Sequence, residues 1–156
     1  TNAGLFVLCI LMFVGASPGS TGGGIKTTTF FVLIQEVRSM FNKRQIGAFR
    51  RGIARNTVAS ASIIALLSMA VVCVGTFLLC VLDPEFTFIQ VLFEVVSAFG
   101  TVGLSTGITP DLSVAGKLVI ILIMFIGRLG AVTLLSIWID HPEPRAYYTE
   151  ETVSIG

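Results

Sequence analysis

Residues 15–28 read GASPGSTGGGIKTT and directly follow the apolar run LFVLCILMFV of residues 5–14. Glycine and proline interrupt helices, because glycine leaves the backbone unusually free and proline removes a hydrogen-bond donor. The apolar stretch as a whole, residues 3–14, has the composition of a membrane helix. At 1.5 Å per residue it falls short of the roughly 20 residues that a membrane span needs. The sequence therefore predicts a helix that breaks at membrane depth.

The composition of the whole chain indicates a membrane protein. Of its 156 residues, 54% are hydrophobic and 12% are charged, whereas about 25% are charged in soluble domains. Seven Lys/Arg residues and one Glu lie between Lys26 and Arg55, so the positive-inside rule predicts that residues 31–57 form a cytoplasmic basic connection. The three cysteines lie in apolar runs and are interpreted as packing thiols.

Three further apolar stretches follow along the chain. Residues 58–82 carry no charge and are long enough to span a bilayer as one helix. Residues 86–104 reach the length of a span only if the glycines near their end are helical, and the sequence from Gly100 to Pro110 is typical of a loop. A helix followed by such a loop would reach halfway and return as a re-entrant hairpin. A plain transmembrane helix is the alternative.

The last apolar stretch, residues 118–139, is interrupted by GRLG at residues 127–130. An unpaired arginine at the centre of a bilayer is costly, so Arg128 is expected to face protein or water. Residues 140–156 are polar and are predicted to form a cytoplasmic tail. The segment LMFVGAS at residues 11–17 resembles IMFIGRL at residues 123–129, which indicates an internal repeat whose copies both break at glycine.

A broken backbone at membrane depth must be buried in protein or line water, because lipid cannot satisfy its hydrogen bonds. Carbonyl oxygens on an extended loop can replace the hydration shell of a potassium ion, and TVG at residues 101–103 is the kind of stretch that presents them. The negative C-terminal end of the preceding helix would favour cations there. This pattern indicates an ion path.

Other interpretations of the polar residues remain open at this point. GSTGGGIKT departs from the phosphate-binding loop by the isoleucine before Lys26. An intramembrane enzyme would use Ser17 or Ser20 as nucleophile with Lys26 or His141 as base, but the pattern offers no convincing partner. Lys26 contributes either to a solvated face that contacts lipid phosphates or to gating. Glu94 is either a cation site or a carboxylate that binds neighbouring backbone.

Three segments resemble the membrane subunit of the Trk/Ktr/HKT potassium transporter family, closest to its Ktr branch: residues 12–30, residues 93–110 and residues 123–135. The resemblance implies an all-α membrane protein built from repeats of helix, re-entrant pore loop and helix. It divides this chain into the second helix of the preceding repeat with a gating loop (1–30), the basic connection (31–57), the last repeat (58–139) and the tail (140–156).

The resemblance also implies roles for individual residues. The selectivity filter of the last repeat would be formed by Thr101, Val102, Gly103 and Leu104. The gate would be formed by Ser17, Pro18, Gly19, Ser20, Thr21, Gly22, Gly23, Gly24 and Lys26, with Arg128 lining the pore opposite that loop. Ala131 stands where proline is common in the family.

The function that follows is potassium uptake across the cell membrane by a multi-pass transporter, with no enzymatic activity. Potassium is the transported ion, sodium an activator, and no cofactor is bound by this chain. Expected partners are membrane lipid, the earlier repeats of the transporter, a second copy in a homodimer and a cytoplasmic nucleotide-binding regulatory subunit. The alternative is a membrane scaffold in which glycines only allow close helix packing.

Overall fold

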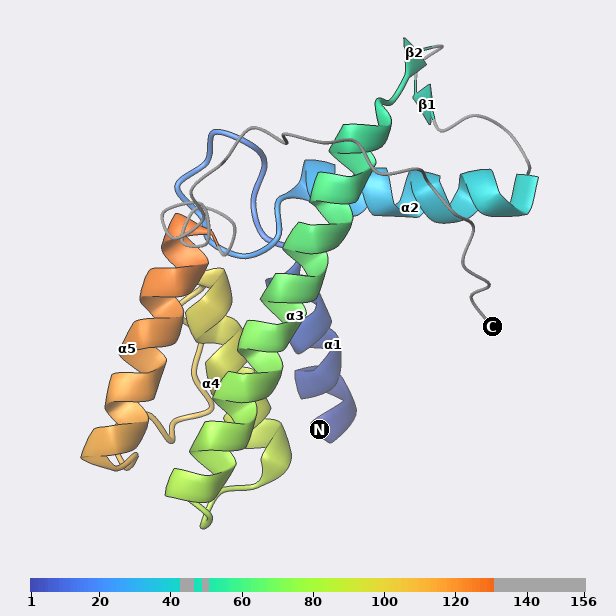
Figure 1. Cartoon of the computed structure of the whole chain (residues 1–156). Coiled ribbons are helices and arrows are strands. Elements are labelled where there is room, and N and C mark those ends of the chain that lie inside the picture. The colour runs from blue at the N-terminus through green and yellow to red at the C-terminus, as the bar shows by residue number, and fades with distance from the viewer. Residues whose placement is uncertain (43–46, 49–50, 131–156) are drawn as a thin grey trace, which may run out of the picture.

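The computed structural model describes residues 1–42, 47–48 and 51–130 (Figure 1). The predicted tail, His141 and the position of Ala131 lie outside these residues. The described chain is all-α, as predicted, apart from a two-residue antiparallel hairpin. Its elements are α1 (Asn2–Phe13), α2 (Thr27–Asn42), β1 (Gly47–Ala48), β2 (Arg51–Gly52), α3 (Arg55–Leu82), α4 (Phe88–Gly100) and α5 (Val114–Leu129).

Helix α3 is long and apolar enough to cross a membrane. It includes the whole of the predicted span at residues 58–82 and begins three residues earlier. Its 28 residues correspond to roughly 42 Å, more than the roughly 30 Å of a hydrocarbon core. Large apolar side chains on it, such as Leu66 and Phe77, are exposed, and an apolar groove of about 430 Å³ lies between α3 and α5. These surfaces suit contact with lipid or with other membrane helices.

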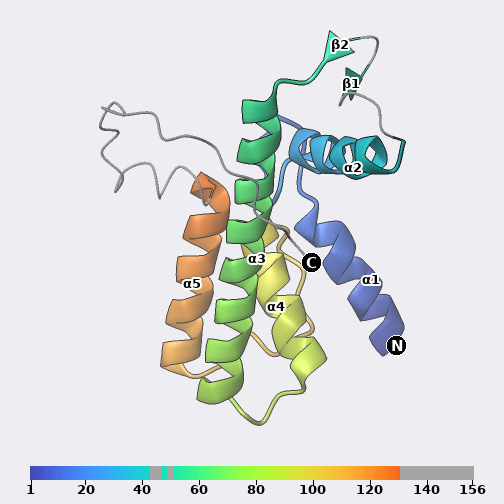
Figure 2. The ribbon, with the colours of Figure 1, turned by 45° about the vertical axis from the view of Figure 1, so that its right-hand side comes forward.

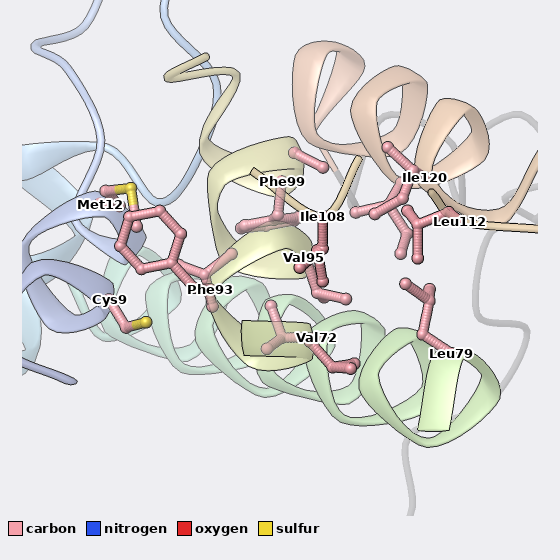
Figure 3. Packing of buried hydrophobic residues seen from close by; sticks show 14 residues of the cluster. Cys9, Met12, Val72, Leu79, Phe93, Val95, Phe99, Ile108, Leu112 and Ile120 are labelled. Atoms are coloured by element: carbon pink, nitrogen blue, oxygen red, sulfur yellow. The ribbon is translucent and has the colours of Figure 1, made fainter. Parts of the chain in front are cut away.

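Helix α4 lies at the centre of the described helices. It has only 13 residues, roughly 20 Å, and every residue from Phe93 to Gly100 is buried. Such all-round burial needs neighbours on every side, and α1, α3 and α5 all pack against it. Figure 3 shows Phe93 of α4 beside Cys9 and Met12 of α1, with Leu79 of α3 and Ile120 of α5 farther along the same cluster.

After α4 the chain turns back instead of continuing along the bundle. The start of α5 lies against the end of α3, because Ser113 donates its backbone N–H to Asp83 Oδ1 at 2.8 Å and its hydroxyl to Asp83 Oδ2 at 3.2 Å. Asp83 is also the C-cap residue of α3, five residues before α4 begins. Helices α4 and α5 therefore start at the same end of the bundle (Figures 1 and 2). Residues 101–113 connect the far end of α4 to that starting end.

Helix α2 lies across the opposite end of α3 rather than along it, in both views (Figures 1 and 2). Helix α2 begins in the predicted gating segment (1–30) and ends in the predicted basic connection (31–57). The division made from the sequence predicts no helix in this region. The Ser62 hydroxyl of α3 donates to Glu36 Oε2 of α2 at 3.3 Å. Several apolar side chains of α2 are exposed, and Met40 and Phe41 are the most exposed of them. An amphipathic helix in this orientation is typical of a membrane interface.

The Asp83 contact predicts a loss of stability when it is removed. Asp83 is 2% exposed, so Asp83→Ala leaves the backbone N–H of Ser113 without its acceptor and should lower the free energy of unfolding by about 2 kcal/mol. Thermal unfolding of the purified protein in detergent measures this. Asp111→Ala is the control, because Asp111 is exposed. An unchanged unfolding temperature for Asp83→Ala would contradict the role given to this contact.

Candidate functional site

Four glycines meet where α1, α4 and α5 end, and we call this set (Gly15, Gly23, Gly100 and Gly127) the glycine junction. A Cβ atom added to Gly127 would clash with the carbonyl oxygen of Phe99, and one added to Gly15 would clash with that of Gly23. A Cβ on Gly100 would lie 2.7 Å from the carbonyl oxygen of Met12. Backbone is thus packed directly on backbone, and no residue with a side chain fits at these positions without displacing its neighbours.

The loop between α1 and α2 folds back on the end of α1. The N–H of Gly15 donates to the Ile25 carbonyl at 2.7 Å, and the N–H of Ile25 donates to the Phe13 carbonyl at 3.2 Å. Gly19 and Gly24 have φ of 84° and 76°, a conformation that side chains disfavour. The loop is therefore a closed structure with defined hydrogen bonds, and glycine is required at two of its turns.

The side chain of Lys26 binds backbone carbonyl groups of this loop. Its ammonium group donates to the Gly22 carbonyl at 2.6 Å and to the Ser20 carbonyl at 3.4 Å. These bonds tie the Lys26 side chain to its own loop, and both interpretations of Lys26, a solvated face that contacts lipid phosphates and a gating residue, stay predictions. Ser17 through Thr21 are exposed, whereas Gly23 is buried.

The buried part of the loop touches the stretch that the sequence predicts as a filter. The N–H of Gly23 donates to Thr101 Oγ1 at 2.8 Å, and a Cβ on Gly23 would lie 2.8 Å from the Phe99 carbonyl oxygen and 3.0 Å from that of Gly127. Thr101 ends α4 in the left-handed conformation, with φ of 51°. Two segments 78 residues apart in the sequence are thereby joined by one hydrogen bond.

The rest of the predicted filter is left uncovered by the residues that the structure describes. Val102 is 45% and Leu104 is 48% exposed, although they directly follow the fully packed end of α4. Gly103 has φ of 84°, and in the described part of the chain no atom beyond Gly103 and its two neighbours lies within 4 Å of where its Cβ would be. Residues 102–104 thus form an irregular, open segment beside a buried helix end, and such a segment requires water or further protein around it at membrane depth.

Glu94 on α4 lies under the loop that follows this segment. It is 5% exposed and accepts hydrogen bonds from Ser105, Thr106 and Thr109. Of the two interpretations left open for Glu94, the geometry agrees with a carboxylate bonded to nearby backbone and hydroxyl groups. The sequence alone gave no way to identify these donors, because they lie 11 to 15 residues away.

Arg128 is exposed and, among the residues that the structure describes, has no hydrogen-bond or ion-pair partner. It follows Gly127 of the glycine junction directly, in the last turn of α5. Helices α1 and α5, which contain the two copies of the predicted repeat, both end near the junction. Helix α5 continues four residues beyond Phe125, the position equivalent to the last residue of α1, so the two copies do not break at the same residue.

The two alternative chemistries gain no support from this geometry. A phosphate-binding loop follows a strand, whereas helix α1 precedes residues 15–26 here. The ammonium of Lys26 is already bound to carbonyl groups of its own loop. For an intramembrane enzyme with Ser17 or Ser20 as nucleophile, the other candidate base, His141, lies outside the described residues.

Comparison with known proteins relates most of the chain to cation transporters. Residues 1–147 match the TrkH family, described as cation transport protein. The chain is 40% identical, over all of its length, to the Ktr system potassium uptake protein D of Bacillus subtilis, of which it covers 35%. It is 39% identical to the potassium/sodium uptake protein NtpJ of Enterococcus hirae and to the Ktr system potassium uptake protein B of Vibrio alginolyticus, covering 36% and 34% of them. The chain thus spans about a third of the length of these curated relatives.

Proposed function

The chain belongs to the TrkH family of cation transport proteins, and we propose that it supplies one selectivity-filter loop and the intramembrane gate of a potassium uptake subunit. The family consists of membrane transporters and not of enzymes. Because the chain covers about a third of the length of its relatives, the proposal includes earlier repeats that complete the pore of a multi-pass protein in the cell membrane.

In this proposal the carbonyl oxygens of Thr101, Val102, Gly103 and Leu104 coordinate the ion. Three features support it: the preceding helix has about two thirds of the length of a span, the segment is open on one side, and Gly103 adopts a conformation that turns successive carbonyls. The C-terminal end of α4 carries partial negative charge at this point, which favours a cation. Each repeat would contribute one such segment, so a single chain segment lines one side of the path.

The gate in this proposal is the loop of residues 17–24 together with Lys26, and Arg128 lines the pore opposite it. The observation that carries the proposal is the hydrogen bond from Gly23 to Thr101, because it holds the glycine-rich loop directly against the first residue of the filter. A loop in this position would obstruct an ion that leaves the filter. Opening then requires the Gly23–Thr101 bond to break.

The proposal retains the partners that the family resemblance implies: membrane lipid, a second copy in a homodimer, and a cytoplasmic nucleotide-binding regulatory subunit. Potassium is the transported ion and sodium an activator. The names of two relatives, which assign them to Ktr systems for potassium uptake, support a subunit that works within a multi-component system.

A scaffold with glycine-mediated packing is the second candidate, and the glycine junction favours it. Close packing accounts for Gly15, Gly23, Gly100 and Gly127. It does not account for Gly103, where nothing lies within 4 Å of the missing Cβ and φ is 84°. An open glycine with a turned backbone fits a filter better than a packing surface.

Substitution of Gly103 tests the proposed filter. Gly103→Ser is expected to leave the chain folded, because the site is open, but to cost about 1–2 kcal/mol in the left-handed conformation and so to turn the adjacent carbonyls away. The measurement is uptake of rubidium and of sodium by cells that express the complete transporter. The wild type should prefer rubidium, and Gly103→Ser should lose most of this preference.

Gly19→Ser is the matched control, since Gly19 has the same φ of 84° and is equally open. It should alter gating without altering the ratio of rubidium to sodium. No rubidium uptake by the wild type would refute the proposed function. Unchanged selectivity of Gly103→Ser, at normal protein levels, would refute the assignment of the filter.

A further inference from the structure

Glu94 is a buried carboxylate whose hydrogen bonds all go to one short loop. Its Oε1 accepts from the Ser105 hydroxyl at 2.7 Å, from the Thr106 N–H at 2.8 Å and from the Thr106 hydroxyl at 3.1 Å. Its Oε2 accepts from the Thr109 hydroxyl at 2.8 Å. We call these contacts the Glu94 clamp. The clamp joins the middle of α4 to the segment that comes immediately after residue 104.

The clamp supplies donors to both oxygens of the Glu94 carboxylate. An ionised carboxylate only accepts hydrogen bonds, and the Thr106 N–H can only donate. The three hydroxyls are free to rotate and donate in the same way. Charge-assisted bonds of this kind are stronger than bonds between neutral groups. Glu94 is therefore satisfied by this loop, which argues against a role as an ion ligand.

The loop itself is tied together around the clamp. The Ser105 and Thr109 hydroxyls lie 2.9 Å apart, and the N–H of Gly107 donates to Ser105 Oγ at 2.9 Å. Ile108 is 5% exposed and packs in the hydrophobic core. The loop is thus anchored to α4 by charge and to the core by an apolar side chain. Between the loop and the helix end, the N–H of Val102 donates to the Ser97 carbonyl at 3.0 Å, and the side chains of Val102 and Leu104 are about half exposed.

Both ends of the open segment are consequently fixed by α4. At one end Thr101 continues from the helix and is bound by Gly23, and at the other end Ser105 and Thr106 are bound by Glu94. A carbonyl ring discriminates between ions of different size only if its oxygens hold their spacing or their field. The spacing of the carbonyls of residues 102–104 depends on where these two ends are held.

We propose that Glu94 is a positioning residue that sets the preference of the transporter for potassium over sodium. It does so by fixing the end of the filter segment that adjoins Ser105 and Thr106. This role rests on the proposed function, since it requires that residues 101–104 bind the ion. Glu94 touches neither the ion nor the path; it acts through Ser105, Thr106 and Thr109. Loosening the clamp relaxes the segment, and a relaxed segment admits the smaller ion more readily.

The test compares variants that remove different numbers of clamp contacts in the complete transporter. Thr109→Val keeps the shape of the side chain and removes one bond, and should lower the ratio of rubidium to sodium uptake about threefold. Glu94→Ala removes all of them and should lower the ratio about tenfold or more. The readout is the ratio of the two initial uptake rates, which does not depend on how much protein each cell contains.

Asp83→Ala is the matched control, because it removes the other buried carboxylate that binds a loop donor, at the start of α5. It should lower the amount of protein and the total uptake while leaving the ratio unchanged. If Glu94→Ala does not accumulate, Thr109→Val decides the question. A wild-type ratio in Thr109→Val, or a fall of equal size in Asp83→Ala, would overturn the positioning role; a wild type without rubidium uptake would instead overturn the proposed function.

Discussion

Gly127→Ala is expected to abolish rubidium uptake and to reduce the amount of folded transporter. The added methyl group would clash with the Phe99 carbonyl oxygen and lie 2.8 Å and 2.9 Å from the carbonyl carbon and Cα of Phe99. These are backbone atoms within a buried helix, so neither side can yield by rotating a side chain. We expect a cost of roughly 3 kcal/mol or more, at the upper end of overpacking in cores.

The displacement would not stay local. Phe99 is followed by Gly100 and Thr101, so separating α5 from α4 moves the end of α4 away from Gly23 and Met12. Uptake and the elution profile of the solubilised protein measure the effect. Gly4→Ala is the control, because Gly4 also lies in a helix but its Cβ would make only an ordinary contact of 3.4 Å with Thr1. Normal uptake by Gly127→Ala would contradict the close packing of α4 on α5.

Deletion of residues 19–24 is expected to raise rubidium uptake about tenfold or more. The deletion removes Gly23 and with it the hydrogen bond to Thr101, and it also removes the carbonyls that Lys26 binds. If the loop holds the path closed for most of the time, its removal shifts the population to the open state, and a large shift multiplies the flux accordingly. Initial uptake rates, normalised to the amount of transporter, provide the measurement.

A single substitution separates release of the loop from damage to the backbone. Lys26→Met keeps the length of the side chain but loses the bonds to Gly22 and Ser20, so it should raise uptake by a smaller factor than the deletion. Lys117→Met is the matched control, because it removes an equivalent bond from an ammonium to the Pro110 carbonyl, 2.7 Å long, outside the gate. Uptake that falls or stays at the wild-type rate in both loop variants would contradict a gating role.

The helices of the bundle were predictable from hydrophobic length and from glycine. The uncharged run at residues 58–82 predicts α3, and the glycine-rich sequence after Phe99 predicts that α4 ends there; the structure confirms both, with α4 ending at Gly100. The start of α5 was expected at residue 118 but lies at Val114. Ser113 caps this helix by accepting from the N–H of Gly116 at 3.0 Å, and Gly116 and Lys117 in the first turn interrupt the apolar run there.

Helix α2 and the contacts of the site were not predictable in the same way. The basic residues of this region predict only a cytoplasmic connection. The signal for a helix from Thr27 is the amphipathic spacing of its aromatic and aliphatic residues. The glycines of residues 15–24 predicted an irregular loop but not its partners. The bond from Gly23 to Thr101 and the clamp of Glu94 depend on how helices distant in sequence pack, which spacing along one chain does not encode.

Diffraction from the complete transporter soaked with rubidium or thallium tests the ion path most directly. We expect anomalous density beside the carbonyl oxygens of residues 101–104, with the loop of residues 17–24 next to it on the side of Thr101. Density at another place in the protein, with residues 101–104 turned toward lipid, would contradict the assignment of both the filter and the gate.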